Sequence, residues 1–241
     1  MEIPSTSVHM CSLAVFFQAF ARSSSTVAKS GNSPSTMRRL QAPLSSSDLL
    51  QRSALNNTTF IPTMIIDHTQ YSVPASEFVN AFESSGIEFV TTVPDMLQIS
   101  LHSALERPGS KIRSINCTTE DQAIETASGL YAGGKKTAIL VQNQGFFAAI
   151  NSIRALGLDG RIPLFMVMGQ FGREWSNLGN DPRTSKRLMV RMLEPLLETL
   201  DIPYWRLESL KDRENIGLAC EAAFKRGGPT ALIVGHFVGF N

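Results

Sequence analysis

Short, continuous apolar runs that alternate with helical patterns dominate the chain after residue 67. Residues 137–142 and 229–234 read TAILVQ and PTALIV. Runs of this kind, without polar alternation, are typical of parallel strands that helices cover on both faces. We expect strands at 88–93, 111–116, 137–142, 163–168, 203–207 and 229–234, and helices at 75–84, 96–106, 120–132, 146–156, 185–200 and 212–225. The alternation predicts an α/β fold, with a doubly wound parallel sheet of about six strands and helices on both faces.

Residues 1–66 have a different composition. The segment is rich in Ser and Thr and shows no sustained helical or strand period. We therefore expect a disordered amino-terminal tail, followed by one globular domain at 67–241. The tail is basic and poor in acids, which is typical of a mitochondrial transit peptide, while an inert tail or a true start at Met37 or Met64 stays open. A cytoplasmic location is the expectation, with the mitochondrion as the alternative.

The composition excludes several classes of function. Lys and Arg total 22 against 21 Asp and Glu, without a basic stripe, so no nucleic-acid partner is expected. No apolar stretch reaches the roughly 18 to 20 residues that span a bilayer, so no membrane partner is expected either. The three cysteines and four histidines show no metal-ligand spacing, and we predict no metal site on this chain. A small molecule is the expected ligand.

Glu120 is the most informative single residue. In doubly wound folds, ligands bind beyond the carboxyl ends of the strands, where the strand order reverses. Glu120 opens a predicted helix directly after the strand expected at 111–116. From its position alone, it is either an acid favoured by the helix dipole or a functional carboxylate. The loops after the strands contain no Gly-rich dinucleotide fingerprint and no phosphate-binding P-loop motif.

The sequence around Glu120 resembles a known family. The run EDQAIETASGLY at 120–131 is similar to the pyrimidine-binding domain of thiamine-diphosphate decarboxylases, in which a glutamate precedes a Gly-Tyr pair by nine residues. The motifs VPD at 93–95, QN at 142–143 followed by Gly145, and LLETLDIPY at 196–204 are similar to those of sulfopyruvate and phosphonopyruvate decarboxylases. The resemblance covers about residues 72–234.

The resemblance implies roles for individual residues. Glu120 would be catalytic and would hydrogen-bond the cofactor's aminopyrimidine, and Gln142, Asn143 and Gly145 would complete the cofactor-binding set. Asp95 and Arg191 would contact the substrate, a small anionic 2-oxo acid. The basic segment 183–191 either supplies anion-binding groups or forms a solvated helix face. Gln144 and the QFGR turn at 170–173 depart from the family pattern, which leaves open a substrate that differs from those of both decarboxylases.

The family also implies a second chain. Its members hold the cofactor's diphosphate and Mg²⁺ through a G-D-G motif on a separate domain, and neither 159–160 nor 179–181 fits that motif. The chain therefore resembles an α subunit of a hetero-oligomer, inactive without a diphosphate-binding subunit. The alternative is a non-catalytic orphan domain that serves as a regulatory or interaction module.

Overall fold

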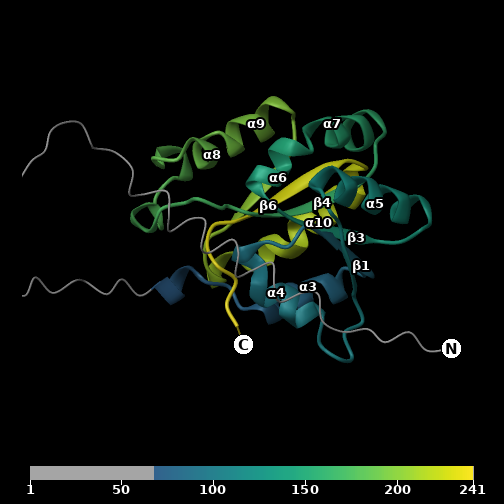
Figure 1. Ribbon diagram of the computed structural model, residues 1–241, viewed down its shortest axis with the longest axis horizontal. Coiled ribbons are helices and arrows are strands. Elements are labelled where there is room, and N and C mark those ends of the chain that lie inside the picture. Colours follow the sequence, from purple (N-terminus) through teal and green to yellow (C-terminus); the bar gives the residue numbers. More distant parts are fainter. Residues whose placement is uncertain (1–67, 241) are drawn as a thin grey trace, which may run out of the picture. The chain divides into compact units, whose positions relative to one another are not determined.

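The computed structural model describes residues 68–240, all of which belong to one compact unit. The predicted tail at 1–66 lies outside the described residues. Residues 68–240 form an open sheet between two layers of helices (Figure 1). The α/β prediction is therefore confirmed for this part of the chain.

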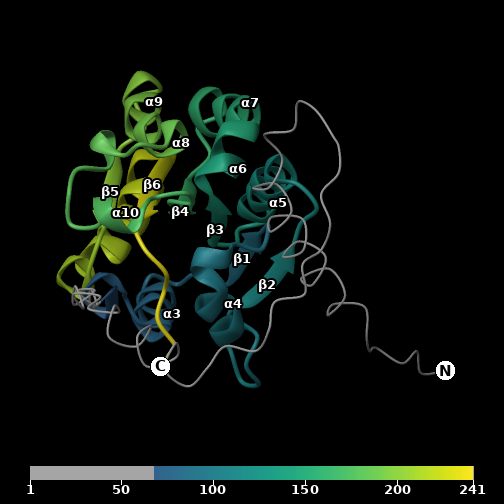
Figure 2. The ribbon, with the colours of Figure 1, turned by 60° about the vertical axis from the view of Figure 1, so that its left-hand side comes forward.

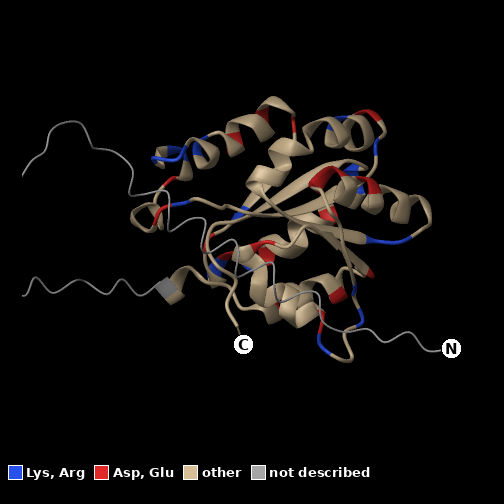
Figure 3. Cartoon of the chain, viewed as in Figure 1, with Lys and Arg blue, Asp and Glu red and all other residues tan. Residues whose placement is uncertain are grey.

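The sheet has six parallel strands in the order β2-β1-β3-β4-β6-β5. The central strands β3, β4 and β6 are buried almost throughout and carry no charged residue (Figure 3). Burial on both faces explains why these strands are continuously apolar in sequence. The strands are β1 (Phe89–Thr92), β2 (Arg113–Asn116), β3 (Thr137–Gln142), β4 (Leu164–Gly169), β5 (Tyr204–Leu207) and β6 (Pro229–Val234).

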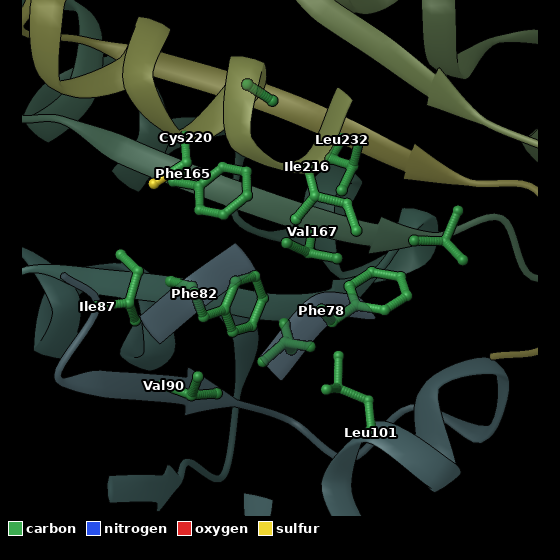
Figure 4. Close-up of a cluster of buried hydrophobic side chains, with 14 of the residues drawn as sticks. Phe78, Phe82, Ile87, Val90, Leu101, Phe165, Val167, Ile216, Cys220 and Leu232 are labelled. Carbon is green, nitrogen blue, oxygen red and sulfur yellow. The ribbon is translucent and has the colours of Figure 1, made fainter. Parts of the chain in front are cut away.

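One face of the sheet is covered by α3 (Ala75–Ser84), α4 (Ile99–Leu105) and α10 (Glu214–Arg226). Phe78 and Phe82 lie one helical turn apart on α3, and both are fully buried (Figure 4). The Phe82 ring meets Phe165 of β4 edge to face, with 6.0 Å between the ring centres. This spacing of apolar residues on α3 fixes which side of the helix faces the sheet.

The other face is covered by α5 (Glu120–Ala132), α6 (Asn143–Ala148) and α9 (Leu193–Thr199) (Figures 1 and 2). Ile124 of α5 and Phe146 of α6 pack with Ile139 of β3 in a second buried cluster. Both α5 and α6 begin at the edge of the sheet where the strands end. Their first residues are therefore placed where this fold class binds ligands.

The helix expected at 146–156 begins earlier than predicted and has three parts. Helix α6 starts at Asn143, directly after the last residue of β3, with no loop residue between them. It is followed by α7 (Ile150–Ser152) and by a π-helical segment, η3 (Ile153–Asp159). Gly157 in η3 packs so closely that a Cβ would lie 2.7 Å from Leu164 Cδ1.

The helix expected at 185–200 is wrong as one continuous element. The chain forms a 3-10 turn, η5 (Pro182–Thr184), and two separate helices, α8 (Leu188–Arg191) and α9. Pro195 explains the break, because its ring conflicts with the carbonyl of residue 191 and it has no N–H to donate. The helix expected at 96–106 likewise divides into a 3-10 turn, η2 (Met96–Gln98), and α4. The remaining short turns are η1 (His68–Tyr71), η4 (Trp175–Asn177) and η6 (Leu210–Asp212).

The strand order reverses between β1 and β3. Strand β1 has β2 on one side and β3 on the other, so the chain builds outward in opposite directions from this pair. The loops that follow two such strands diverge and leave a crevice at their carboxyl ends. Candidate functional groups therefore belong at the ends of β1 and β3.

Candidate functional site

Asp95 lies at the reversal point and is enclosed by hydrogen-bond donors. Its Oδ1 accepts from the backbone N–H of Leu97 at 2.9 Å and from Gln142 Nε2 at 3.0 Å. Its Oδ2 accepts from Gln98 Nε2 at 2.9 Å. Gln142 is the last residue of β3, so its hydrogen bond joins the loop after β1 to the end of β3 across the reversal point.

The Asp95 side chain is 2% exposed. Burial raises the pKa of its carboxyl, while the donors from Gln98, Leu97 and Gln142 oppose that shift by favouring the ionised form. Gly169, the last residue of β4, makes room for the carboxyl, since a Cβ there would lie 1.9 Å from Asp95 Oδ2. Asp95 is therefore an acid held in one orientation without a cation among its hydrogen-bond partners.

His102 of α4 is the neutral neighbour of this acid. Its Nε2 accepts a hydrogen bond from the backbone N–H of Asp95 at 3.2 Å. Burial lowers the pKa of His102 to about 4, because the charged imidazolium would lose its hydration. The imidazole therefore remains neutral near pH 7 and acts as an acceptor.

Glu120 is the first residue of α5 and is half-buried. Its side chain lies against Gly145 in the first turn of α6. A Cβ on Gly145 would be 2.2 Å from Glu120 Cγ and 2.7 Å from its Oε1. Within residues 68–240, no hydrogen bond or ion pair engages the Glu120 carboxylate. The group is thus placed by packing and keeps its hydrogen-bonding capacity.

The junction of β3 and α6 brings the two acids together. Gln142 binds Asp95, and Gly145, three positions later, contacts Glu120. Four of the six predicted site residues therefore share one segment of the sheet edge: Asp95, Glu120, Gln142 and Gly145.

Asn143 is fully buried and binds backbone groups. Its Nδ2 donates to the carbonyls of Phe171 at 3.1 Å and Met189 at 3.2 Å, and its Oδ1 accepts from the N–H of Gln144. Asn143 thus ties the segment after β4, and helix α8, to the start of α6. Its side chain therefore stabilises the backbone that surrounds the site.

Arg191 ends α8, and its guanidinium donates to the carbonyl of Ser185 at 2.8 Å. No described contact joins Arg191 to Asp95 or Glu120 within residues 68–240. The rest of the basic segment 183–191 is not one helix face. Arg183 donates to Glu194 at 2.8 Å and also contacts Glu198 and Tyr204, so its charge is already paired.

Three structural features escaped the sequence analysis. Gln98 and Gly169, which shape the surroundings of Asp95, were not singled out. Gln98 stands three residues after the N-cap residue Asp95, which is a capping-box spacing that could have flagged it. Arg173, noted only as a departure from the family turn, is 1% exposed and forms an ion pair with Glu208 at 2.6 Å. This pair holds the segment after β4 against the end of β5.

The described part of the chain has neither a metal-binding cluster nor a membrane-spanning helix. Residues 68–240 contain no cluster of three or more His, Cys, Asp or Glu side chains that could hold a metal ion. No helix in the same range has the length and apolar character needed to cross a bilayer.

The fold and the site define an open α/β domain that gathers two carboxylates at the reversal point of its sheet. Three sulfopyruvate decarboxylase alpha subunits are similar to the chain. The subunit of Methanococcus maripaludis is 33% identical over 132 residues, covering 54% of this chain and 75% of the relative. Those of Methanocaldococcus jannaschii and Methanothermobacter thermautotrophicus are 30% and 28% identical, covering 64% and 67% of this chain and 88% and 96% of the relatives. No protein-family model matches the chain. The chain belongs to the family of sulfopyruvate decarboxylase alpha subunits.

Proposed function

We propose that the chain is the α-type subunit of a thiamine-diphosphate-dependent decarboxylase of small anionic 2-oxo acids similar to sulfopyruvate. Its relatives are named as alpha subunits of sulfopyruvate decarboxylase, which supports a decarboxylase that acts as a complex of chains. A second subunit would hold the cofactor's diphosphate and Mg²⁺. The isolated chain is then expected to be inactive.

The placement of Glu120 is the observation that carries this proposal. An acid at the first position of a helix is common, because the helix dipole stabilises a negative charge there. Glu120 differs in that its side chain packs against a glycine at the start of a neighbouring helix and keeps an unpaired, half-buried carboxylate. This arrangement suits a group that shares a proton with a heterocycle bound at the sheet edge.

The residues present fit the aminopyrimidine end of the cofactor. Glu120 would hold a proton at a ring nitrogen, and the absence of a side chain at Gly145 leaves room for its carboxylate. Gln142 and Asn143 would keep the β3–α6 junction in place, since their amides bind Asp95 and backbone carbonyls. When bound, thiamine diphosphate would supply the electron-accepting ring that allows carbon dioxide to leave.

Asp95 and Arg191 would act at the substrate end. Asp95 is a buried acid whose pKa is raised by burial, so it can hold a proton closer to neutrality than a solvated aspartate. Arg191 carries a positive charge on the segment that Asn143 ties to the site. A guanidinium there would pair with the anionic group of the substrate.

Reconstitution tests the proposal. The chain is mixed with a diphosphate-binding subunit from the same source, thiamine diphosphate and Mg²⁺, and carbon dioxide release from sulfopyruvate is measured. We expect turnover that Glu120→Gln abolishes, while Glu125→Gln, an exposed change on the same helix, leaves it intact. Equal loss in both variants, or no loss with Glu120→Gln, contradicts the role of Glu120. No turnover with any candidate subunit or 2-oxo acid favours the orphan module.

A further inference from the structure

Gln98 makes an unusual set of contacts for a fully buried amide. Its Nε2 lies 2.9 Å from Asp95 Oδ2 and 3.2 Å from the carbonyl oxygens of both Val141 and Val167. Those carbonyls belong to β3 and β4, which are neighbours in the sheet. One side chain therefore connects the loop after β1 to the ends of the two central strands.

The oxygen of the same amide lowers the stability of the fold. Gln98 Oε1 is buried and has no hydrogen-bond partner among residues 68–240. An unpaired buried carbonyl destabilises a fold by roughly 1 to 3 kcal/mol, so the contacts of Nε2 are made at a cost on the Oε1 side of the amide. A hydrogen bond to a carboxylate is stronger than one to a neutral group, which explains the orientation of the amide toward Asp95.

The three donors to Asp95 differ in how they are held. The Leu97 N–H belongs to the turn that Asp95 itself caps, and Gln142 is partly exposed at the end of β3. Gln98 alone among these donors is both fully buried and anchored to two strands by further contacts. It therefore fixes Oδ2, the oxygen that faces Gly169.

We propose that Gln98 is a positioning residue for Asp95, which holds the carboxyl in place against the ends of β3 and β4. The part of this role that concerns turnover rests on the proposed decarboxylase function. A residue that served only stability would change the free energy of unfolding and leave the proton equilibrium of Asp95 unchanged. A positioning residue changes both.

The first measurement needs neither a mutation at Gln98 nor a partner subunit. The carboxyl carbon of Asp95 and the side-chain amide of Gln98 are followed by NMR in the full chain as the pH is raised, with Asp95→Asn identifying the carboxyl signal. We expect the Gln98 amide to shift with the same midpoint as the Asp95 carboxyl. An amide signal that does not respond to that midpoint overturns the proposal.

The second measurement compares two buried changes on neighbouring turns. Gln98→Met removes the donor and keeps the volume, so the pKa of the Asp95 carboxyl should rise. Ser100→Ala removes a buried hydrogen bond to the carbonyl of Val238, at 2.6 Å, that does not involve Asp95. We expect this control to leave the Asp95 midpoint unchanged. Equal Asp95 midpoints in the wild-type and Gln98→Met chains overturn the proposal. If Gln98→Met does not fold, the titration of the Gln98 amide in the wild-type chain is the test.

The reconstituted two-subunit enzyme provides the functional measurement. We expect Gln98→Met to lower kcat about tenfold, the equivalent of one hydrogen bond to a charged group, with little change in KM. The limb of the pH–rate profile that follows Asp95 should move to higher pH. An enzyme without any turnover would contradict the decarboxylase function alone, because the NMR midpoints would still decide the role of Gln98.

Discussion

The Glu120 side chain lies directly against the α-carbon of Gly145, and a Cβ on that glycine would come within 2.2 Å of Glu120 Cγ. Real side chains do not tolerate such a contact, so Glu120 can keep its position only while residue 145 is glycine. The two residues are 25 positions apart and lie in the first turns of neighbouring helices. Their contact is what places an acid at the reversal point of the sheet.

Replacing Gly145 tests this contact directly. Gly145→Ala should displace the Glu120 carboxylate and lower kcat/KM of the reconstituted enzyme by about 100-fold, as expected for a misplaced catalytic group. Gly217→Ala is the control, because a Cβ at this position in α10 meets nothing within 4 Å. The control should keep full activity and gain about 0.5 to 1 kcal/mol of stability from the loss of a helical glycine. Wild-type activity in Gly145→Ala would show that Glu120 does not depend on this glycine.

Gly169→Ala should destabilise the chain through Asp95. The new Cβ would lie 1.9 Å from Asp95 Oδ2 and 2.9 Å from its Cγ, so the carboxyl must leave its donors. Breaking a hydrogen-bonded buried charge costs about 2 kcal/mol or more. Urea denaturation of the full chain at pH 7 measures the loss. Adding Asp95→Ala should restore part of it, and an unchanged cost in that double variant would place the strain elsewhere.

His102 should make the fold sensitive to acid. Its pKa is about 4 in the folded chain and near 6.5 when unfolded, so the unfolded state takes up the proton first as the pH falls. Its contribution is complete above about pH 7 and is lost on acidification through about pH 4, a change of about 3 kcal/mol. Denaturation curves at several pH values should show this loss in the wild-type chain and a smaller one in His102→Gln, which keeps an acceptor for the Asp95 N–H.

Asp95 acts in the opposite direction. Because burial raises its pKa, the folded chain keeps a proton that the unfolded chain has lost, and stability falls as the pH rises above 3.8. Asp95 is present in both the wild type and His102→Gln, so the difference between their stability curves reports on His102. Parallel stability curves for the two chains between pH 4 and pH 6.5 would contradict the assignment to His102.

The Arg173–Glu208 ion pair, in which the arginine side chain is buried, should contribute more to stability than a fully exposed pair. The Arg173 side chain is 1% exposed and that of Glu208 23%, and Arg173→Met would leave Glu208 without its cation beside the end of β5, at a cost of about 2 to 3 kcal/mol. Lys111 pairs with Glu83 at 3.3 Å but is 80% exposed, so Lys111→Met should cost less than about 1 kcal/mol. Thermal or urea unfolding of both variants gives the comparison, and equal costs would contradict the argument from burial.

The central strands β3, β4 and β6 could be predicted from sequence because burial on both faces makes each of them a continuous apolar run. Runs such as TAILVQ need no knowledge of distant residues to be recognised. The helix at 185–200 was wrong for an equally local reason, since the effect of Pro195 on the preceding turn was overlooked. The start of α6 at Asn143 was missed because polar residues there resemble a loop, and only their contacts with Phe171 and Met189 explain the helix.

The site residues that belong to a family motif could be predicted from sequence, and those defined only by their contacts could not. Glu120, Asp95, Gln142 and Gly145 were named from motifs, and the structure brings them to one edge. The capping-box spacing between Asp95 and Gln98 is a local signal, but Gly169 carries none, because a glycine becomes informative only beside the carboxyl for which it makes room. Contacts between residues 69 or 74 positions apart leave no pattern that a local reading of sequence can detect.

The absence of any loop residue between β3 and α6 limits where the chain can change in length at this edge of the sheet. Gln142, which binds Asp95, and Gly145, which contacts Glu120, lie on a strand and a helix that follow one another directly. An inserted residue between them would therefore shift one of these contacts relative to the other. The segment 170–187 contains only short turns, so, apart from the contacts of Phe171 with Asn143 and of Arg173 with Glu208, its length can change more easily than that of the β3–α6 junction.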